Sequence, residues 1–573
     1  MKFAPSTLLF LVVLFASVVN CFSLDREAFS IRNYDLKLQV DPAQHRLGGR
    51  GKVTLRNDTK APQTIAVLQV SSSLDWRSVR VGDKAVQVVR QPYASDMDHT
   101  GALSEAIVTL PQAVAPQGTV DLTIAYEGVI TLDATRLTRI GTPQDAAEST
   151  DWDRIDPNFS AVRGAGYVAW YPIATEAANL SEGDSLFEVL ARWRAREAGA
   201  NMDMFFESTK DSPILLNGTP VGFVVVMEPD EHIVKIADSD VDDTSWDVPI
   251  FAMANFKTID VKPFSKIAFL PGREGAAESY RSLLQDLNPL PSGRGAQGIE
   301  IVELPYANAA PFWAGEILLM PLKSSPTTAD RLTLVYALAR RGRRSPRLWI
   351  GEGLAHYAQV RDLEQQHGRP AALDYLKSHL QALAGFEEEQ SDASRDPAEA
   401  AERSLIDMTD EVSMQSKAMW VWWMLRDMLE EVPFNFAVSR YRSFEDKNPS
   451  YMQKLLEGPT RPDLQWFFDD WVYHDRGLPD FKVASAFSTK TTTGSFIVTV
   501  TVDNLGAAGA EVPVIVKFTG GESTKRLEVR GKNKATIRVE VPAAPQEIVV
   551  NDGSVPESDV TNNVFKIEAA EKQ

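Results

Sequence analysis

Cysteine and basic residues are the scarce components of this 573-residue sequence. Its single cysteine, Cys21, cannot form a disulfide within the chain. Lysine and arginine together number 59, against 78 aspartate and glutamate residues, and the formal net charge is -19. Nucleic acids and anionic lipid surfaces are bound through basic patches, so this imbalance argues against both as partners. We interpret the acidity as a source of solubility.

Long hydrophobic runs are missing after the first 23 residues. The run Leu8–Val19 is too short to cross a bilayer comfortably and has the length of the apolar region of a signal peptide. We therefore assign residues 1–23 to a signal peptide and expect an exported protein, periplasmic or secreted, with no later transmembrane segment. Cys21 could be acylated as in a lipoprotein, but Val18-Val19-Asn20 fits that signal poorly, so ordinary cleavage is favoured.

Short strands of alternating polarity are expected throughout residues 24–256. Their period of two is typical of strands with one buried face, and turn residues such as Asn57-Asp58 separate them. The clearest runs are Tyr34–Val40, Gly51–Arg56, Thr64–Val70, Ala106–Leu110 and Val120–Tyr126. The pattern predicts an N-terminal domain built on antiparallel β-sheet.

Helical periodicity replaces the strand pattern in residues 257–480. Asp330–Arg341 is apolar at helical spacing, and Asp330 is a candidate N-cap. One strand, Ile299–Leu304, is expected before the helices begin. Further helices are predicted near residues 352–364, 371–384, 415–431 and 433–443, and at Asp463–Trp471. This part is predicted to be a mainly helical domain.

Strands return from residue 481 to residue 573. Four runs within about 90 residues suggest an immunoglobulin-like β-sandwich. They are Ser495–Val502, Val512–Phe518, Arg526–Val529 and Ala535–Val541. The oxygen-rich segment Asn551–Asn563 could hold calcium, although Asx turns explain the same residues without a metal. The expected fold class is thus a multidomain α+β protein of three parts.

This order of domains, together with Trp349-Ile350-Gly351-Glu352-Gly353, resembles the membrane alanyl aminopeptidase family of gluzincin metallopeptidases. Val248–Phe256 is similar to the last strand of that family's N-terminal domain, and Ile301–Pro305 to the strand that enters its catalytic domain. Ser416–Trp420 and Gln465–Trp471 are similar to two of its later helices. The resemblance implies a thermolysin-like middle domain.

The resemblance also implies a zinc site, and most of that site is missing. The family binds zinc through two histidines four positions apart and a glutamate of the next helix, and a further glutamate is the general base. Tyr336 and Arg340 stand at the histidine positions, Ala337 at the base position, and only Glu352 is retained. Tyrosine is a poor zinc ligand, arginine repels the cation, and alanine cannot accept a proton.

Two other family elements are replaced as well. Gln415 stands at the position of the tyrosine that stabilises the oxyanion, although an amide can also donate a hydrogen bond there. The motif that anchors the substrate amine is absent from Ala310–Glu316, where Glu316 is the nearby carboxylate.

Two arrangements of the remaining residues are considered. Glu352 and His356 lie four positions apart and could supply two metal ligands from one helix face, but no third ligand is evident. We favour an ion pair between Glu352 and Arg340, with His356 as a packing residue and no cofactor. The basic run Arg340–Arg344 is interpreted as a solvated loop, and Trp420–Trp423 as core packing.

Three functions follow from these observations, and whether the protein is an enzyme is left uncertain. The favoured one is an exported, aminopeptidase-like pseudo-peptidase that binds a peptide or protein partner in the former active-site cleft. The first alternative is an active zinc aminopeptidase with unconventional ligands, such as Glu352 and His356. The second is surface attachment through the C-terminal sandwich. The combined loss of both histidines, the base and the tyrosine favours the pseudo-peptidase.

Overall fold

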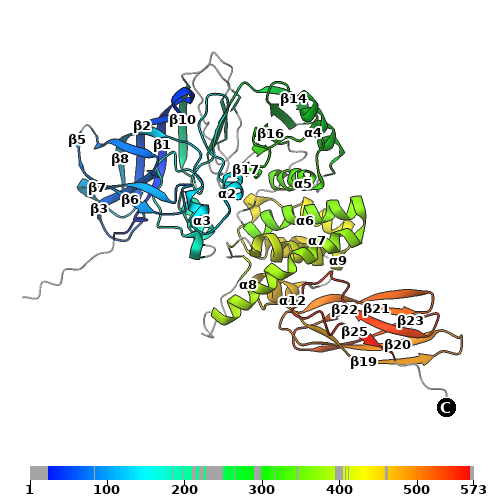
Figure 1. Ribbon diagram of the computed structural model, residues 1–573. Coiled ribbons are helices and arrows are strands. Elements are labelled where there is room, and N and C mark those ends of the chain that lie inside the picture. Colours follow the sequence, from blue (N-terminus) through cyan, green and yellow to red (C-terminus); the bar gives the residue numbers. More distant parts are fainter. Residues whose placement is uncertain are drawn as a thin grey trace, which may run out of the picture.

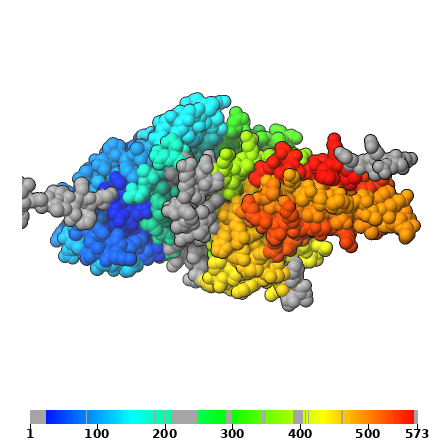
Figure 2. Space-filling model, turned by 90° about the horizontal axis from the view of Figure 1, so that it is seen from below, coloured from blue at the N-terminus to red at the C-terminus, as the bar shows by residue number. Residues whose placement is uncertain are grey.

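The computed structural model describes residues 24–82, 84–182, 185–197, 199–208, 214–217, 225–226, 249–263, 265–288, 298–314, 317–342, 345, 347–393, 404–406, 408, 410, 412–458 and 463–567. The expected signal peptide with Cys21, the carboxylate Glu316 and the pair Arg343-Arg344 lie outside these residues. Strands, then helices, then strands follow one another through the molecule (Figure 1). The space-filling view shows the N-terminal, middle and C-terminal parts of the chain in the same order along its long axis (Figure 2). The chain is therefore a multidomain α+β protein, as predicted.

The N-terminal region is built on two sheets that enclose one apolar core. The larger sheet has the order β10 (Asn201–Ser208), β1 (Phe29–Asp41), β2 (Arg46–Asn57), β8 (Thr119–Val129), β4 (Leu74–Val81) and β5 (Lys84–Ala85). The smaller sheet has the order β3 (Gln63–Ser71), β7 (Ala102–Val114) and β6 (Gln87–Ala94). Neighbouring strands are antiparallel, except that β1 and β10 are parallel. The predicted alternation is confirmed, since Tyr34, Leu36, Leu38 and Val40 are all buried.

Helices and a third sheet in the N-terminal region were not expected from the sequence. The helices are α1 (Thr135–Thr138), α2 (Gln144–Thr150) and α3 (Ser185–Glu197), with short 3-10 turns η1 (Pro42–Gln44) and η2 (Leu180–Glu182). The sheet has the order β12 (Val225–Val226), β11 (Ile214–Asn217), β13 (Ile250–Met253) and β9 (Ser160–Val162). Helix α3 packs Val189 and Trp193, four positions apart, into the N-terminal core. The predicted β-sheet of this region is present, and the helices are elements that the sequence analysis did not find.

The middle region begins with a five-stranded sheet rather than the one strand expected. Its order is β14 (Lys257–Val261), β15 (Ser265–Phe269), β16 (Glu300–Glu303), β18 (Ile317–Met320) and β17 (Phe312–Ala314), with helix α4 (Glu274–Asp286) between β15 and β16 in sequence. Strand β18 is buried at all four positions, so its residues do not alternate. Short, fully buried strands cannot be distinguished from buried helix by periodicity alone, which is why β18 was not predicted.

The helices of the middle region follow this sheet, and they include the predicted ones. They are α5 (Thr328–Gly342), α6 (Leu348–His367), α7 (Arg369–Ser378), α8 (Leu380–Ala393), α9 (Ala418–Leu429), α10 (Glu431–Ser439), α11 (Tyr451–Glu457) and α12 (Gln465–Phe468). Two π-helical segments, η3 (Ser413–Lys417) and η5 (Asp469–Tyr473), extend α9 and α12, and η4 (Ser443–Glu445) is a 3-10 turn. None of the described helices combines the length and apolarity of a membrane span.

The N-cap of α5 differs from the prediction. The helix begins at Thr328, so Thr327 is the capping residue and Asp330 lies inside the first turn. The Asp330 amide donates to Thr327 Oγ1 at 3.3 Å, and the Thr327 amide donates to Asp330 Oδ2 at 2.7 Å. This reciprocal pair is a capping box, in which two side chains satisfy amides that lack helical partners.

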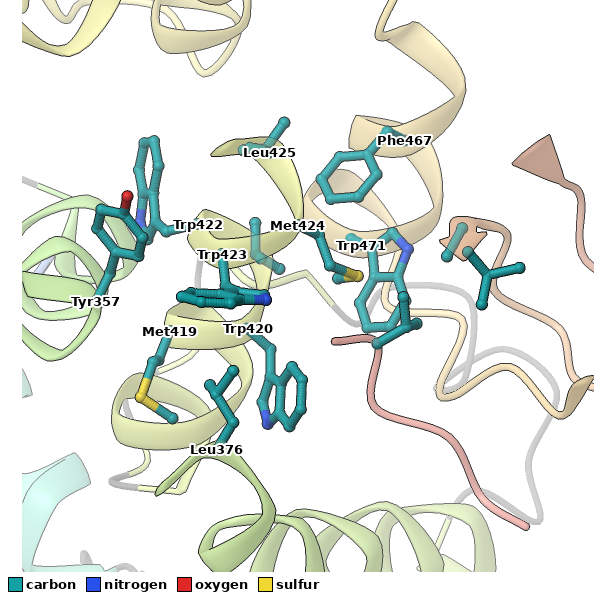
Figure 3. Close-up of a cluster of buried hydrophobic side chains, with 14 of the residues drawn as sticks. Tyr357, Leu376, Met419, Trp420, Trp422, Trp423, Met424, Leu425, Phe467 and Trp471 are labelled. Atoms are coloured by element: carbon teal, nitrogen blue, oxygen red, sulfur yellow. The ribbon is translucent and has the colours of Figure 1, made fainter. Parts of the chain in front are cut away.

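Tryptophans pack densely in the core of the middle region (Figure 3). Trp420, Trp422 and Trp423 project from α9 and are fully buried, which confirms their predicted packing role. Trp422 stacks on Trp349 with ring centroids 5.0 Å apart. A side chain at Gly353 would place its Cβ 2.9 Å from the Trp422 indole, so only glycine allows this contact. The Trp349–Gly353 motif thus has a packing role that does not depend on catalysis.

The C-terminal region consists of two sheets. One has the order β19 (Phe481–Lys490), β20 (Phe496–Asn504) and β23 (Lys534–Val541), and the other β22 (Gly521–Val529), β21 (Ala510–Phe518), β24 (Pro545–Val550) and β25 (Val564–Lys566). The buried alternate residues of both sheets belong to the same apolar core as the tryptophans of α9. The predicted strands are therefore confirmed.

The oxygen-rich segment near the end of the chain forms Asx turns, which was one of the two interpretations of its sequence. Asn551 Oδ1 accepts from the amides of Gly553 and Val555 at 3.0 and 3.2 Å, and Asp552 Oδ1 accepts from Ser554 at 3.0 Å. These side-chain oxygens are thus used by the backbone of the turn.

Candidate functional site

A cavity of about 410 Å³ lies where the N-terminal and middle regions meet. Its size is within the range of small-molecule and peptide-end sites. The N-terminal region contributes Tyr167, Phe187, Leu190, Ala191 and Arg194, and the middle region contributes Pro311, Phe312, Trp313, Leu318, Thr333, Tyr336, Leu348, Glu352, His356, Met414 and Gln415. Four of the six candidate site residues, Tyr336, Glu352, His356 and Gln415, therefore line one cavity.

Helical spacing explains how two helices present these residues together. On α5, Thr333 and Tyr336 lie three positions apart, and on α6, Leu348, Glu352 and His356 lie four positions apart. Residues three or four apart share one face of a helix, so each helix turns a single stripe to the cavity. Ala337 does not share this stripe and is buried in the core beneath the five-stranded sheet.

Glu352 is held by two neighbours at the cavity wall. The Tyr336 hydroxyl donates to Glu352 Oε2 at 2.5 Å, and Arg340 Nη2 lies 2.8 Å from Glu352 Oε1. The side chains of Arg340 and Glu352 are only 12% and 20% exposed, respectively. The predicted pairing of Glu352 with Arg340 is confirmed. The interpretation of the basic run as a solvated loop was wrong for Arg340, which lies in the last turn of α5.

Burial and neighbouring charges set the protonation states of Glu352 and Tyr336. Burial acts to raise the pKa of Glu352, but the Arg340 charge and the Tyr336 hydrogen bond outweigh it and hold the pKa below its ordinary value. Burial, reinforced by the Glu352 charge, raises the pKa of Tyr336 well above its ordinary value. At neutral pH the site therefore contains a carboxylate, a guanidinium and a neutral phenol.

These residues do not fit a zinc ion. Each oxygen of Glu352 is engaged, one by Arg340 and one by Tyr336, and a guanidinium 2.8 Å away repels a dication. No cluster of three or more histidine, cysteine, aspartate or glutamate side chains that could hold a metal is found among the described residues.

His356 lines the cavity and also packs within the helices. Its ring centroid lies 5.0 Å from that of Tyr336, and its Nδ1 lies 3.0 Å from Gln359 Oε1. Gln359 is fixed in turn, since its Nε2 donates to the Leu332 carbonyl at 3.1 Å. Burial lowers the pKa of His356, and this outweighs the opposing effect of the Glu352 charge. The imidazole is therefore neutral at pH 7.

Gln415 reaches the cavity from the π-helical segment η3. Met414 and Gln415 line the cavity, while Lys417, at the end of the same segment, is buried and pairs with Glu387 and Asp475. Single π-helical turns are often found at functional sites, where they shift side chains relative to a regular helix. The segment that carries Gln415 therefore ends at a buried ion-pair network.

The walls supplied by the N-terminal region were not found from the sequence. Helix α3 contributes Phe187, Leu190 and Arg194, and a loop contributes Tyr167. The amphipathic spacing of residues 185–197 was the available signal for α3, but no local pattern indicates that this helix faces α6. Phe312 and Trp313 also line the cavity, and they belong to residues 310–316, where the amine-anchoring motif was sought and not found. The Arg340 guanidinium lies 5.3 Å from the centroid of the Trp313 ring.

Arg163 fixes the aromatic walls across the junction. Its Nη2 lies 2.6 Å from Asp153 Oδ2, and both side chains are buried. Its guanidinium stacks 3.6 Å from the Tyr167 ring and 4.0 Å from that of Trp152. Tyr167 contacts Phe312 with ring centroids 5.1 Å apart. One buried cation therefore supports aromatic side chains from both regions.

Comparisons with known proteins give structural neighbours only. No protein-family model and no curated protein matches the chain. An M1 zinc metallopeptidase from Deinococcus radiodurans, a single-residue mutant bound to a Tyr-Ser-Ala substrate, aligns at 16% identity and TM-score 0.44, covering 80% of this chain and 97% of that chain. A second structure of that mutant aligns at 15% identity and TM-score 0.41, with the same coverage. Both neighbours are of the class that the sequence resembles.

Proposed function

We propose that this protein is an exported, non-hydrolytic binding protein on an aminopeptidase-like scaffold, and that the cavity takes a short peptide or the end of a partner protein. The scaffold would comprise a β domain at residues 24–256, a gluzincin-like domain at 257–480 and an immunoglobulin-like sandwich at 481–573. The observation that carries the proposal is the state of Glu352, which is bound by Tyr336 and Arg340 where the resemblance places zinc.

The energetics of this group favour binding over metal-assisted hydrolysis. A zinc ion at Glu352 would have to displace Arg340, whose side chain is only 12% exposed. Breaking a buried ion pair by removing one partner typically costs about 3–5 kcal/mol, because a charge is left uncompensated. Ala337 provides no proton acceptor, so a metal-bound water would also lack its base.

The composition of the cavity supports a peptide as ligand. Its walls are aromatic and aliphatic, with a small number of polar groups among them, as in most sites for organic ligands. Tyr167, Phe312 and Trp313 offer rings that can pack against apolar side chains.

Elemental analysis of the dialysed full chain tests the proposal. We expect no stoichiometric zinc in the wild type or in the Glu352→Ala and His356→Ala variants. About one zinc per chain in the wild type, lost in both variants, would overturn the proposal and restore the metallopeptidase alternative.

A designed variant supplies the positive control. Tyr336→His combined with Arg340→His places two imidazoles four positions apart, opposite Glu352. If the backbone of the former site is intact, this double variant should bind about one zinc per chain. Zinc binding by the double variant alone would show that side chains, and not the fold, prevent metal binding.

A further inference from the structure

The side-chain amide of Gln359, next to the cavity, has only one possible orientation. Its Nε2 lies 3.1 Å from the Leu332 carbonyl of α5, and a carbonyl can only accept a hydrogen bond. The amide nitrogen therefore faces Leu332, and Oε1 points away from it. The Tyr375 hydroxyl donates to this Oε1 at 3.5 Å, which agrees with that orientation. Gln359 Oε1 is thus fixed as an acceptor.

The orientation of Gln359 determines which nitrogen of His356 carries the proton. His356 Nδ1 lies 3.0 Å from Gln359 Oε1, and because this oxygen can only accept, Nδ1 must donate. Burial lowers the pKa of His356, so the ring is neutral at pH 7 and holds a single proton. His356 Nε2 therefore has a free electron pair and can only accept a hydrogen bond.

No donor for His356 Nε2 is found among the described residues. The ring lines the cavity, and its Nδ1 side is occupied by Gln359. The adjacent Tyr336 hydroxyl already donates to Glu352. Nε2 is open to solvent, unlike the two ring nitrogens of His99, which are buried without a partner. A ligand that fills the cavity must therefore supply a donor to Nε2 or leave a buried acceptor unpaired, which weakens binding.

Aromatic rings make up much of the remaining lining. Tyr167 and Phe187 come from the N-terminal region, and Phe312 and Trp313 come from the middle region. The Phe187 side chain is 40% exposed, so its ring is available to a ligand. Such rings pack favourably against another ring, edge to face or offset. A ligand side chain that combines a ring with a hydrogen-bond donor therefore matches both parts of the lining.

We infer that the cavity takes a tyrosine side chain of a peptide, with its ring among these aromatic residues and its hydroxyl donating to His356 Nε2. This inference rests on the proposed function, because it names the residue that the cavity selects in a peptide. A phenylalanine has the same ring but leaves Nε2 unpaired, and a serine has the hydroxyl but no ring. Sites that bind a hydroxyl reject the analogue without it for the same reason. His356 is thus a specificity-determining residue.

Titration calorimetry with four neutral probes tests the inference on the full chain. Each probe is an N-acetyl-Ala-X-amide, in which X is tyrosine, phenylalanine, O-methyltyrosine or tryptophan. We expect the tyrosine probe to bind at least about ten-fold more tightly than the phenylalanine probe. The O-methyltyrosine probe should bind no better than the phenylalanine probe, because its oxygen has no proton to donate. The tryptophan probe should bind more weakly than the tyrosine probe.

Two variants on helix α6 localise the effect. His356→Phe keeps a ring beside Tyr336 but removes the acceptor, so the ratio of tyrosine to phenylalanine affinity should fall to about one. His367→Phe is the matched control, because His367 lies on the same helix, is exposed and does not line the cavity. This control should keep the ratio of the wild type. Thermal melting of both variants checks that they fold.

Each outcome decides between the two proposals. Equal binding of the tyrosine and phenylalanine probes, or an unchanged ratio in folded His356→Phe, would overturn the tyrosine inference and leave peptide binding in place. Equal binding of the tyrosine and O-methyltyrosine probes would overturn it too, because the hydroxyl would not be donating. Tighter binding of the tryptophan probe would replace the phenol by an indole and so overturn the inference. If none of the probes binds, both this inference and the proposed peptide-binding function fail.

Discussion

The middle region meets its two neighbours in different ways. Towards the C-terminal strands it shares one apolar core, which runs without interruption from Val335 on α5 through Trp471 to Val550 on β24. Towards the N-terminal region the contact combines a small apolar cluster, the buried Arg163–Asp153 pair and the cavity. A shared core couples two parts into one folding unit, whereas a junction with a cavity gives a ligand access to both sides. The second junction is therefore where binding is expected.

This contrast changes how the C-terminal strands should be studied. The boundary expected at residues 480 and 481 falls inside the shared core. The Trp471 indole donates to the Gly509 carbonyl at 2.7 Å, and Asp470 Oδ2 accepts from the Gly509 amide at 2.8 Å. Deleting residues 481–573 would expose this core, so a truncated chain cannot separate attachment through the C-terminal strands from a loss of folding. Point variants on the outer face of the strands are the better test.

The largest expected effect comes from breaking the shared core. Trp471→Ala removes a fully buried indole and should lower the free energy of unfolding by about 3–5 kcal/mol. Urea denaturation followed by circular dichroism measures this change. Phe487→Ala is the control on the C-terminal strands, because Phe487 is 68% exposed and should change stability by less than about 0.5 kcal/mol. Separate transitions for the middle and C-terminal regions would contradict the single core.

The next effect comes from the polar junction. Arg163→Met leaves the buried carboxylate of Asp153 without its main partner and should cost about 3 kcal/mol of stability. The same change removes the support of Tyr167 and should weaken binding of a short peptide in the cavity. The double variant Arg163→Met with Asp153→Asn should recover part of the stability but not the binding, since the aromatic wall stays unsupported. Recovery of both would show that Arg163 does not position the wall.

The smallest expected effect is a pH dependence of the free energy of unfolding that comes from Glu300. Burial raises the pKa of Glu300, on β16 in the sheet next to the cavity junction, from 4.5 to about 7. The folded protein then binds more protons than the unfolded chain between these two values. The contribution of Glu300 to stability is therefore full below pH 4.5 and is lost as the pH rises towards about 7.

Glu300→Gln should remove this pH dependence. At about pH 8 the variant should be about 2–3 kcal/mol more stable than the wild type, because it avoids burying a charged carboxylate. At about pH 5 the two proteins should be nearly equal. Urea midpoints at both pH values measure the difference, and an equal gain at both would show that Glu300 is already ionised in the folded protein at low pH.

Local patterns in the sequence predicted most of the fold, and their failures have physical causes. Alternation located strands that bury one face, such as β1 and β20. It missed β18, because a strand buried on both faces does not alternate. It also placed the N-cap of α5 at Asp330, three residues late, because an acidic residue in the first turn resembles a cap when the threonine before it is overlooked.

The candidate site could be predicted only in part. Tyr336, Glu352 and Gln415 were found because they occupy motif positions, and opposite charge predicted the pairing of Arg340 with Glu352. Arg194 could not be found in this way, because no local pattern states which helix α3 will face. The approach of α3 to α5 and α6 is set by packing between regions that are distant in sequence.

Deletion of one residue from the π-helical segment η3 would change the lining of this cavity. A π-turn contains one residue more than the α-helical turn that it replaces, and each residue of an α-helix turns the chain by about 100°. Loss of a single codon in residues 413–417 is expected to convert the segment to regular helix and to rotate Gln415 relative to the cavity. The tryptophans of α9, which follow the segment, would keep their positions. A length change of one residue in this segment would thus alter the lining of the cavity while the core remains intact.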